Sequence, residues 1–261
     1  MLRRARLLVA YDGTSFHGFA GNPGVRTVAG VLVDAISKVA RHPVELTGAG
    51  RTDAGVHGWG QVISCDLPEE TDLGGLARRV SSLCAPAVAI RSACWATPDF
   101  DARFSASWRH YRYTVLNTPL PNPFLAATAW HVPQPLDVMG MRLGCDPLIG
   151  EHDFSSFCRR PKLSPADVTA GRTPPTLVRR VLLARWDEVD DGVLRFEIRA
   201  TAFCHQMVRS IVGTLVEVGL GRRRAGQVRG VLIAKDRSLA GPVAPPQGLC
   251  LWEVGYPDIT W

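Results

Sequence analysis

The chain lacks any long uninterrupted apolar segment, which excludes the commonest class of membrane protein. No stretch of its 261 residues approaches the roughly 18 apolar residues that a helix needs to cross a bilayer. An apolar run at residues 7–10 follows Arg3, Arg4 and Arg6, but it ends at the sequence Tyr11-Asp12-Gly13. Such a run is too short for the core of a signal peptide. The sequence therefore predicts a cytoplasmic protein without a membrane segment.

The cysteines lack the spacing of a zinc site. There are seven, an odd number, with no CxxC pair and no cluster of histidine and cysteine of the kind that binds zinc. Scattered thiols of this kind fit reduced cysteines in a reducing compartment. We expect no metal site.

Disorder is excluded by the composition, and the charge balance indicates which partners are favoured. Hydrophobic residues make up 46% and charged residues 21% of the chain, as in a globular protein of one large domain or two smaller ones. The net charge is +6, with a sequence pI of about 9.2. Excess positive charge attracts polyanions such as nucleic acid, although many basic proteins never bind one.

Hydrophobic periodicity predicts two similar successions of strands and helices. In the first half, strands are predicted at 6–11, 61–66 and 88–94, with one helix that begins after Thr27 and another near 76–83. In the second half, strands are predicted at 110–116, 177–186, 193–201 and 249–255, with helices at 136–149, 205–218 and 227–234. Each half approximates a β-α-β-β-α-β unit. We therefore expect an α+β protein whose halves, 1–105 and 106–261, share a large, mostly antiparallel sheet flanked by helices. A long basic loop is predicted at 158–176.

The most distinctive run is Gly48-Ala49-Gly50-Arg51-Thr52-Asp53-Ala54-Gly55-Val56-His57. Its glycines permit tight turns and the close approach of a large substrate. Arg51, Asp53 and His57 place a cation, a carboxylate and a titratable ring within seven residues. An Asp in such a loop can also serve only to cap the following backbone, and spacing alone leaves both interpretations open.

Two further runs combine cations with other chemistry. His205 and Arg209 are four residues apart and are predicted to share one helix face. An arginine near a helix start is not placed to favour the helix dipole, which indicates another reason for its position. Residues 103–113 interleave arginines with aromatic residues. That pattern suits RNA, but it also fits an amphipathic strand with tyrosines in the core.

Seven segments together resemble the TruA family of tRNA pseudouridine synthases, in the family's order and over nearly the whole chain. They are YDGTSFHGF (11–19), GRTDAGVHG (50–58), FSASWRHYRY (104–113), GEHDFSSF (150–157), FCHQMVRSIVGTLVEVG (203–219), KDR (235–237) and APPQGLCL (244–251). The resemblance implies the pseudouridine synthase fold. It also implies a cofactor-free isomerase that converts uridine to pseudouridine at positions 38–40, in the anticodon stem-loop of tRNA. A cytoplasmic homodimer with tRNA as its partner is implied as well.

The same resemblance assigns roles to individual residues. Asp53 matches the catalytic aspartate, Arg209 the arginine that pairs with it, and Tyr111 the tyrosine that stacks on the target base. Leu249 matches an apolar residue of the pocket, and Arg51 a residue that helps to displace or hold the flipped nucleotide. The remaining substrate-binding candidates are Tyr11, His57, His205 and Arg112.

The chain departs from the family pattern where Phe19-Ala20 replaces a usual Trp-Gln and where Ala29 replaces a glutamine. We expect these changes to affect RNA docking or packing more than chemistry. Three alternatives compete with the main interpretation. They are a related synthase with another RNA target, a non-catalytic RNA-binding protein on the same scaffold, and a metal-dependent hydrolase built on Asp53, His57, His205 and Cys204. Mapping the modified nucleotide would address the first, an intact Asp53 and Arg209 disfavour the second, and the third has no ligand spacing to support it.

Overall fold

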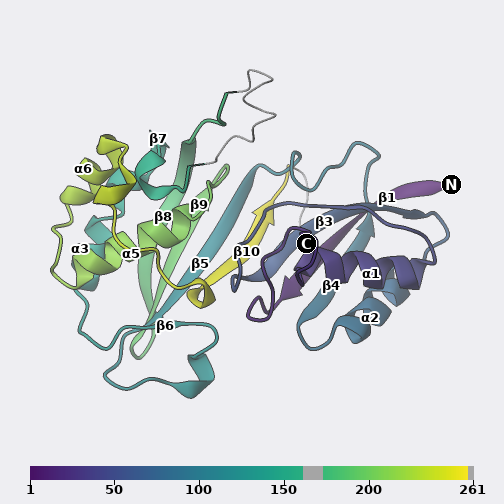
Figure 1. Ribbon diagram of the computed structural model, residues 1–261, viewed down its shortest axis with the longest axis horizontal. Helices are drawn as coiled ribbons and strands as arrows, with labels where there is room; N and C mark the ends of the chain where they lie inside the picture. The colour runs from purple at the N-terminus through teal and green to yellow at the C-terminus, as the bar shows by residue number, and fades with distance from the viewer. Residues whose placement is uncertain (161–172, 258–261) are drawn as a thin grey trace. The chain divides into compact units, whose positions relative to one another are not determined.

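The computed structural model describes residues 1–160 and 173–257, and the chain divides into two compact units (Figure 1). The first unit comprises residues 1–112 together with the C-terminal segment from Pro246, and the second comprises residues 113–245. Strand β5 (Trp108–Leu116) contributes residues to both units. The sequence instead places the division at 105/106 and keeps the C-terminal segment with the second half. That assignment of domains remains a prediction.

The sheet of the first unit has the strand order β4-β1-β3-β10-β5, and β2 pairs with β3. Strand β1 runs antiparallel to both of its neighbours, β3 and β4, whereas β10 runs parallel to β3. The strands are β1 (Leu2–Tyr11), β2 (Leu46–Gly48), β3 (His57–Pro68), β4 (Val88–Trp95) and β10 (Leu249–Gly255). Because β10 lies beside β3, the last strand of the chain reaches the residues that follow the Asp53 loop.

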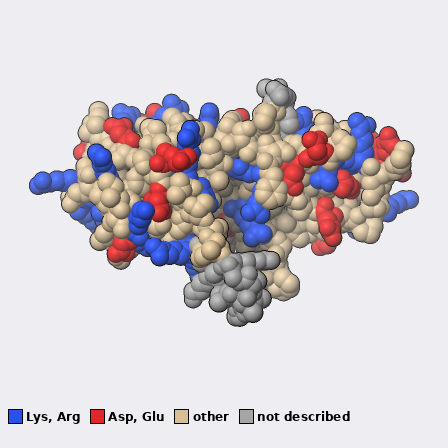
Figure 2. Space-filling model, turned by 90° about the horizontal axis from the view of Figure 1, so that it is seen from above, with Lys and Arg blue, Asp and Glu red and all other residues tan. Residues whose placement is uncertain are grey.

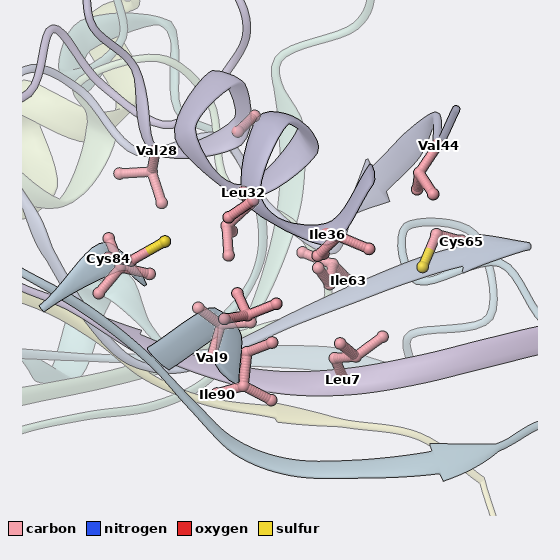
Figure 3. Close-up of a cluster of buried hydrophobic side chains, with 14 of the residues drawn as sticks. Leu7, Val9, Val28, Leu32, Ile36, Val44, Ile63, Cys65, Cys84 and Ile90 are labelled. Carbon is pink, nitrogen blue, oxygen red and sulfur yellow. The ribbon is translucent and has the colours of Figure 1, made fainter. Parts of the chain in front are cut away.

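Helices α1 (Val28–Ala40) and α2 (Leu73–Cys84) pack on the sheet of the first unit (Figure 3). Alternate residues of the strands face these helices, as the period of a strand requires. Leu7, Ile63 and Ile90 from three strands meet Leu32 and Ile36 of α1, all of them buried. The predicted cap of α1 is confirmed, since Thr27 Oγ1 accepts a hydrogen bond from Gly30 N at 3.2 Å.

The two departures from the family pattern lie in this same core. Phe19 is 3% exposed and its ring lies 6.1 Å from that of Tyr11, centroid to centroid. Ala29 is also buried, and its N–H donates to Phe19 O at 2.9 Å. Both residues are therefore part of the packing beneath the Asp53 loop.

The second unit contains strands in the order β5-β9-β8-β7, and β6 pairs in parallel with β5. Trp186 of β8 and Phe196 of β9 are buried with ring centroids 5.2 Å apart. The strands are β6 (Trp130–His131), β7 (Gly150–Asp153), β8 (Val178–Asp190) and β9 (Val193–Ala200). Among its described residues, the α-helices are α3 (Val138–Leu143), α5 (Met207–Gly219) and α6 (Gln227–Ala234). The 3-10 helices in the described part of the chain are η1 (Pro123–Leu125), η2 (Asp146–Leu148), η3 (Ser155–Phe157), η4 (Arg237–Leu239) and η5 (Pro246–Gly248).

The predicted α+β class, with helices beside a mostly antiparallel sheet, is confirmed. The expected helix at 136–149 is wrong, because α3 ends at Leu143 and is followed by η2 and then by β7. The helix expected from 205 begins at Met207. Within the predicted basic loop, residues 161–172 lie outside the described residues. In the part of the chain that the structure describes, no helix is long and apolar enough to cross a membrane.

Candidate active site

The distinctive glycine-rich run forms the loop between β2 and β3, and Asp53 opens a tight turn within it. Val56 N donates to Asp53 O at 3.1 Å, which closes the turn, and Gly55 N donates to Phe16 O at 3.3 Å. Gly55 has a φ of +77°, a conformation that other residues rarely adopt. The Asp53 side chain is partly exposed. A carboxylate is thus presented from a backbone turn that itself requires glycine.

Hydrogen bonds fix the backbone at three of the four residues that precede Asp53, namely Ala49, Gly50 and Thr52. Arg109 donates from Nε and Nη2 to Ala49 O, at 3.2 and 2.9 Å. The side-chain amide of Gln61 bonds both the N–H and the C=O of Gly50, at 3.3 and 2.8 Å. Thr52 O accepts from the N–H of Phe19 at 3.1 Å. Because these bonds involve main-chain groups, they set the path of the loop whatever its own side chains do.

Tyr11, a predicted substrate-binding residue, lies in the core beneath this loop. It is 5% exposed, and its hydroxyl lies 2.9 Å from Thr52 Oγ1. Burial raises the pKa of Tyr11 above its usual range, so its phenol stays neutral under ordinary conditions.

His57 joins the loop to two other segments of the first unit. Its ring is nearly buried, with Nδ1 3.0 Å from Gly13 N and Nε2 3.1 Å from Gln247 O. A neutral ring with its proton on Nε2 satisfies both contacts, because it accepts at Nδ1 and donates at Nε2. Asp12 Oδ1 also lies 3.2 Å from Nδ1.

Tyr111 of β5 stands close to the same loop. A Cβ placed on Gly50 would lie 3.7 Å from the Tyr111 hydroxyl and 3.8 Å from Leu251 Cδ2. Burial raises the pKa of Tyr111 above its usual range, and the nearby charge of Asp53 raises it further. The structure thus brings together the predicted catalytic carboxylate and the predicted stacking tyrosine, with the phenol neutral.

The other candidates of the first unit lie at different distances from this pair. Leu249 is buried at the start of β10, directly after the segment that accepts the His57 bond. Arg51 is exposed, between the held residues Gly50 and Thr52. Arg112 follows Tyr111 on β5 and therefore points to the opposite face of the strand. Its guanidinium carbon lies 3.8 Å from the centre of the Trp252 ring.

The remaining two candidates, Arg209 and His205, belong to the second unit. Arg209 lies in the first turn of α5, and its Nε donates to Ala244 O at 2.7 Å while its own carbonyl accepts from Ala244 N at 3.0 Å. His205 is exposed and precedes the helix, so the expectation that it shares a helix face with Arg209 is wrong. Gln206, with a φ of +63°, breaks the helical path between them.

Two residues that matter to the loop, Gln61 and Arg109, are absent from the sequence-based candidates. Gln61 is fully buried on β3, and Arg109 is 9% exposed on β5. A glutamine among apolar residues of a strand, and an arginine with little access to water, are unusual in a core unless their polar atoms have partners. The glutamine among apolar residues is visible in the sequence, whereas the burial of Arg109 is not.

Among the described residues, no three or more His, Cys, Asp and Glu side chains gather as a possible metal-binding group. The metal-hydrolase alternative, built on Asp53, His57, His205 and Cys204, therefore finds no ligand set there. His57 in particular already bonds backbone groups through both ring nitrogens.

Comparisons with known proteins identify the family of the chain. The family described as tRNA pseudouridine synthase matches residues 7–104 and 145–257. Proteins named tRNA pseudouridine synthase A are similar over nearly the whole chain. That of Frankia casuarinae is 45% identical, covering 98% of this chain and 90% of that protein. That of Corynebacterium glutamicum is 41% identical with the same coverage, and that of Geobacter sulfurreducens is 36% identical, covering 98% of this chain and all of that protein.

Solved structures offer a more distant likeness. The archaeal box H/ACA sRNP Nop10–Cbf5 complex matches with a TM-score of 0.34 and 13% identity, covering 81% of this chain and 44% of that chain. At that distance the likeness carries no argument, and the assignment depends on sequence. With identities of 36–45% over 98% of its length, the chain belongs to the tRNA pseudouridine synthase family.

Proposed function

We propose that the protein isomerises uridine to pseudouridine at positions 38–40, in the anticodon stem-loop of tRNA, with Asp53 as the catalytic carboxylate. The observation that carries the proposal is the presentation of Asp53, near Tyr111, from a loop whose backbone is fixed by buried side chains. Membership of the family and the names of its relatives support uridine in tRNA as the substrate.

The reaction is an isomerisation, so every atom that leaves one position of the nucleotide returns at another. The N1–C1′ bond breaks, the ring turns, a C5–C1′ bond forms, the proton on C5 is lost, and N1 ends with a proton. No electron donor, electron acceptor or transferred group is needed. A carboxylate can serve as the nucleophile or as the base that removes a sugar proton. Attack at C1′, attack at C6 and a glycal route all remain compatible with Asp53.

Arg209 and Tyr111 take supporting roles in this proposal. We assign Arg209 to pair with Asp53 and to orient its carboxylate, as the resemblance implies. A uridine within a stem must first be flipped out of the stack. Stacking on Tyr111 offsets part of that cost, at roughly 1–3 kcal/mol for a base on an aromatic ring. Leu249 would line the apolar side of the same pocket.

Recognition of several tRNAs at one place requires contacts to shape and phosphates more than to base edges. The net charge of +6 fits this requirement, and lysine and arginine side chains are spread over the face seen in Figure 2. The exposure of Arg51, close to Asp53 in the sequence, supports a role for it in contacting the flipped nucleotide or its phosphate. We also infer that the protein is a homodimer and that it is cytoplasmic, as the resemblance implies. Light scattering of the purified protein tests the oligomeric state.

The test is to incubate the protein with unmodified tRNA transcripts in EDTA and to map pseudouridine by carbodiimide-blocked primer extension. Asp53→Asn removes the charge and keeps the size, so we expect a loss of roughly 10²–10⁴-fold in rate with tRNA binding nearly unchanged. Asp66→Asn is the matched control, since that carboxylate pairs with Arg4 at 2.7 Å away from the loop, and it should stay active.

The positions of the primer-extension stops distinguish the proposal from its alternatives. Stops at positions 38–40 in the wild-type and Asp66→Asn lanes, but not in the Asp53→Asn lane, support both the target and the catalytic residue. Stops elsewhere would overturn the target and keep the chemistry. Tight tRNA binding without any stop would favour the non-catalytic alternative.

A further inference from the structure

The side chain of Gln61 is completely buried on β3, and its carboxamide acts as a backbone partner for the Asp53 loop. Nε2 donates to Gly50 O at 2.8 Å, while Oε1 accepts from Gly50 N at 3.3 Å and from Val62 N at 3.2 Å. The two backbone donors require an oxygen at the Oε1 position, which fixes the orientation of the amide. Both polar groups of the Gly50 backbone are thereby held, three residues before Asp53.

The same amide lies near Tyr11, which contacts Thr52. The nearby Gln61 amide lowers the pKa of Tyr11 against the larger effect of burial, and the Tyr11 hydroxyl lies 2.9 Å from Thr52 Oγ1. The Tyr11 ring is itself fixed in the hydrophobic core of the first unit. The residues on both sides of Arg51 are therefore held by two neighbouring side chains, Gly50 by Gln61 and Thr52 by Tyr11.

We propose that Gln61 is a positioning residue for Asp53, and that it acts together with Tyr11. The inference rests on the proposed function, in which Asp53 is the catalytic carboxylate. A displacement of about 1 Å at a reacting group can cost roughly 100-fold in rate, and a glycine-rich loop has no side chains of its own at Gly50 and Gly55 to resist such a displacement. Tyr11 then influences the reaction through Thr52, in place of the substrate contact that the sequence predicts.

Two other roles for Gln61 give different results. A residue needed only for folding lowers the melting temperature and leaves the single-turnover rate at saturating tRNA unchanged. A residue needed for RNA binding raises the dissociation constant for tRNA. A positioning residue lowers the saturated rate while the dissociation constant stays the same.

The experiment compares Gln61→Met, Gln61→Glu and Tyr11→Phe with the wild type under single-turnover conditions. Met keeps the length of the side chain and removes its three hydrogen bonds to Gly50 O, Gly50 N and Val62 N, so we expect roughly a 100-fold loss of saturated rate. Tyr11→Phe removes only the hydroxyl and should lose less. Combined with Gln61→Met, it should add less than it does alone, because the two neighbouring side chains hold adjoining residues of the same loop.

Gln61→Glu supplies a readout that a folding role would not produce. A buried carboxyl has a raised pKa, and its protonated form regains one donor for Gly50 O. The rate of this variant, divided by that of the wild type at each pH, should therefore rise as the pH falls. Ser64→Ala is the control on the same strand: Ser64 is equally buried and accepts from Ala102 N at 3.1 Å, so its loss should affect stability and not the saturated rate.

Rates of Gln61→Met and Tyr11→Phe within about twofold of an active wild type would overturn this inference and leave Asp53 as assigned. A rise in the dissociation constant that accounts for the whole loss would overturn it in favour of RNA binding. A wild-type protein that forms no pseudouridine would instead overturn the proposed function, and this inference with it.

Discussion

The His57 ring holds the C-terminal end of the Asp53 loop, and its replacement tests whether the residue supports the loop or contacts RNA. One ring nitrogen bonds Gly13 N and the other bonds Gln247 O, at 3.0 and 3.1 Å. The side chain is almost inaccessible to water. We expect His57→Ala to destabilise the protein and His57→Asn to destabilise it less.

The magnitude follows from the two backbone groups that would lose their partner. A buried donor or acceptor left unsatisfied costs about 1–3 kcal/mol, so the alanine variant, which leaves two, should lose about 2–6 kcal/mol. Asn places its Oδ1 near the position of Nδ1 in the histidine ring and can still accept from Gly13 N. Only the bond to Gln247 O is then lost, and the cost falls to about half.

Urea unfolding measures these differences, and tRNA binding below the transition separates the two roles. Support of the loop predicts the ranking wild type, Asn, Ala in stability, with the affinity of the folded variants for tRNA little changed. If both variants were as stable as the wild type to within about 0.5 kcal/mol but had lost tRNA affinity, the reasoning would be refuted. His57 would then be the substrate-binding residue that the sequence predicts.

Two further predictions concern the surface and the packing of the same loop. Arg51 is exposed, so Arg51→Ala should weaken binding similarly for different tRNAs and reduce the slope of log affinity against log salt by about 1; filter binding at several salt concentrations measures it, and an unchanged slope would argue against a phosphate contact. A Cβ on Gly13 would lie 2.0 Å from Val56 O, a backbone atom, whereas one on Gly21 meets nothing within 4 Å. Gly13→Ala should therefore cost roughly 1–3 kcal/mol or more, while Gly21→Ala should stay within about 0.5 kcal/mol; equal unfolding free energies for the two would contradict the geometry.

Local signals predicted the periodic elements well. Helix α6 and strand β10 have the bounds that the sequence predicts. Helix α1 begins after Thr27 as predicted, because the Thr27 hydroxyl caps the helix by accepting from Gly30 N, only three residues later. The helix expected at 136–149 failed because Pro147 lies within it and cannot donate a helical hydrogen bond. Strand β7, which follows, exists through pairing with β8, some thirty residues later, and no local pattern encodes such a partner.

The contrast between local signals and long-range partners also applies to the site residues: the sequence identifies some of them and misses others. Asp53 and Tyr111 stand in segments that resemble the TruA family, and the structure places them near each other. Arg109 stands in a run whose arginines and rings suit RNA, yet it is buried and bonds Ala49 O. Arg109 bonds a backbone group 60 residues away in the chain, and Gln61 bonds one 11 residues away. These partners can be identified only from the folded structure.

The glycines make the Asp53 loop flexible, whereas the buried side chains that bond to the loop restrain it. Glycine allows the backbone to turn tightly and a bulky tRNA to come close, but it loses more conformational freedom on folding than any other residue. A loop built from glycine alone would therefore present Asp53 over a range of positions. The bonds from the buried side chains of Arg109, Gln61 and His57 restrict that range, whereas Arg51 of the same loop is exposed. Loosening any one of them should consequently reduce the rate of the bound complex before it reduces the affinity for tRNA, because the surface that meets the RNA is left unchanged.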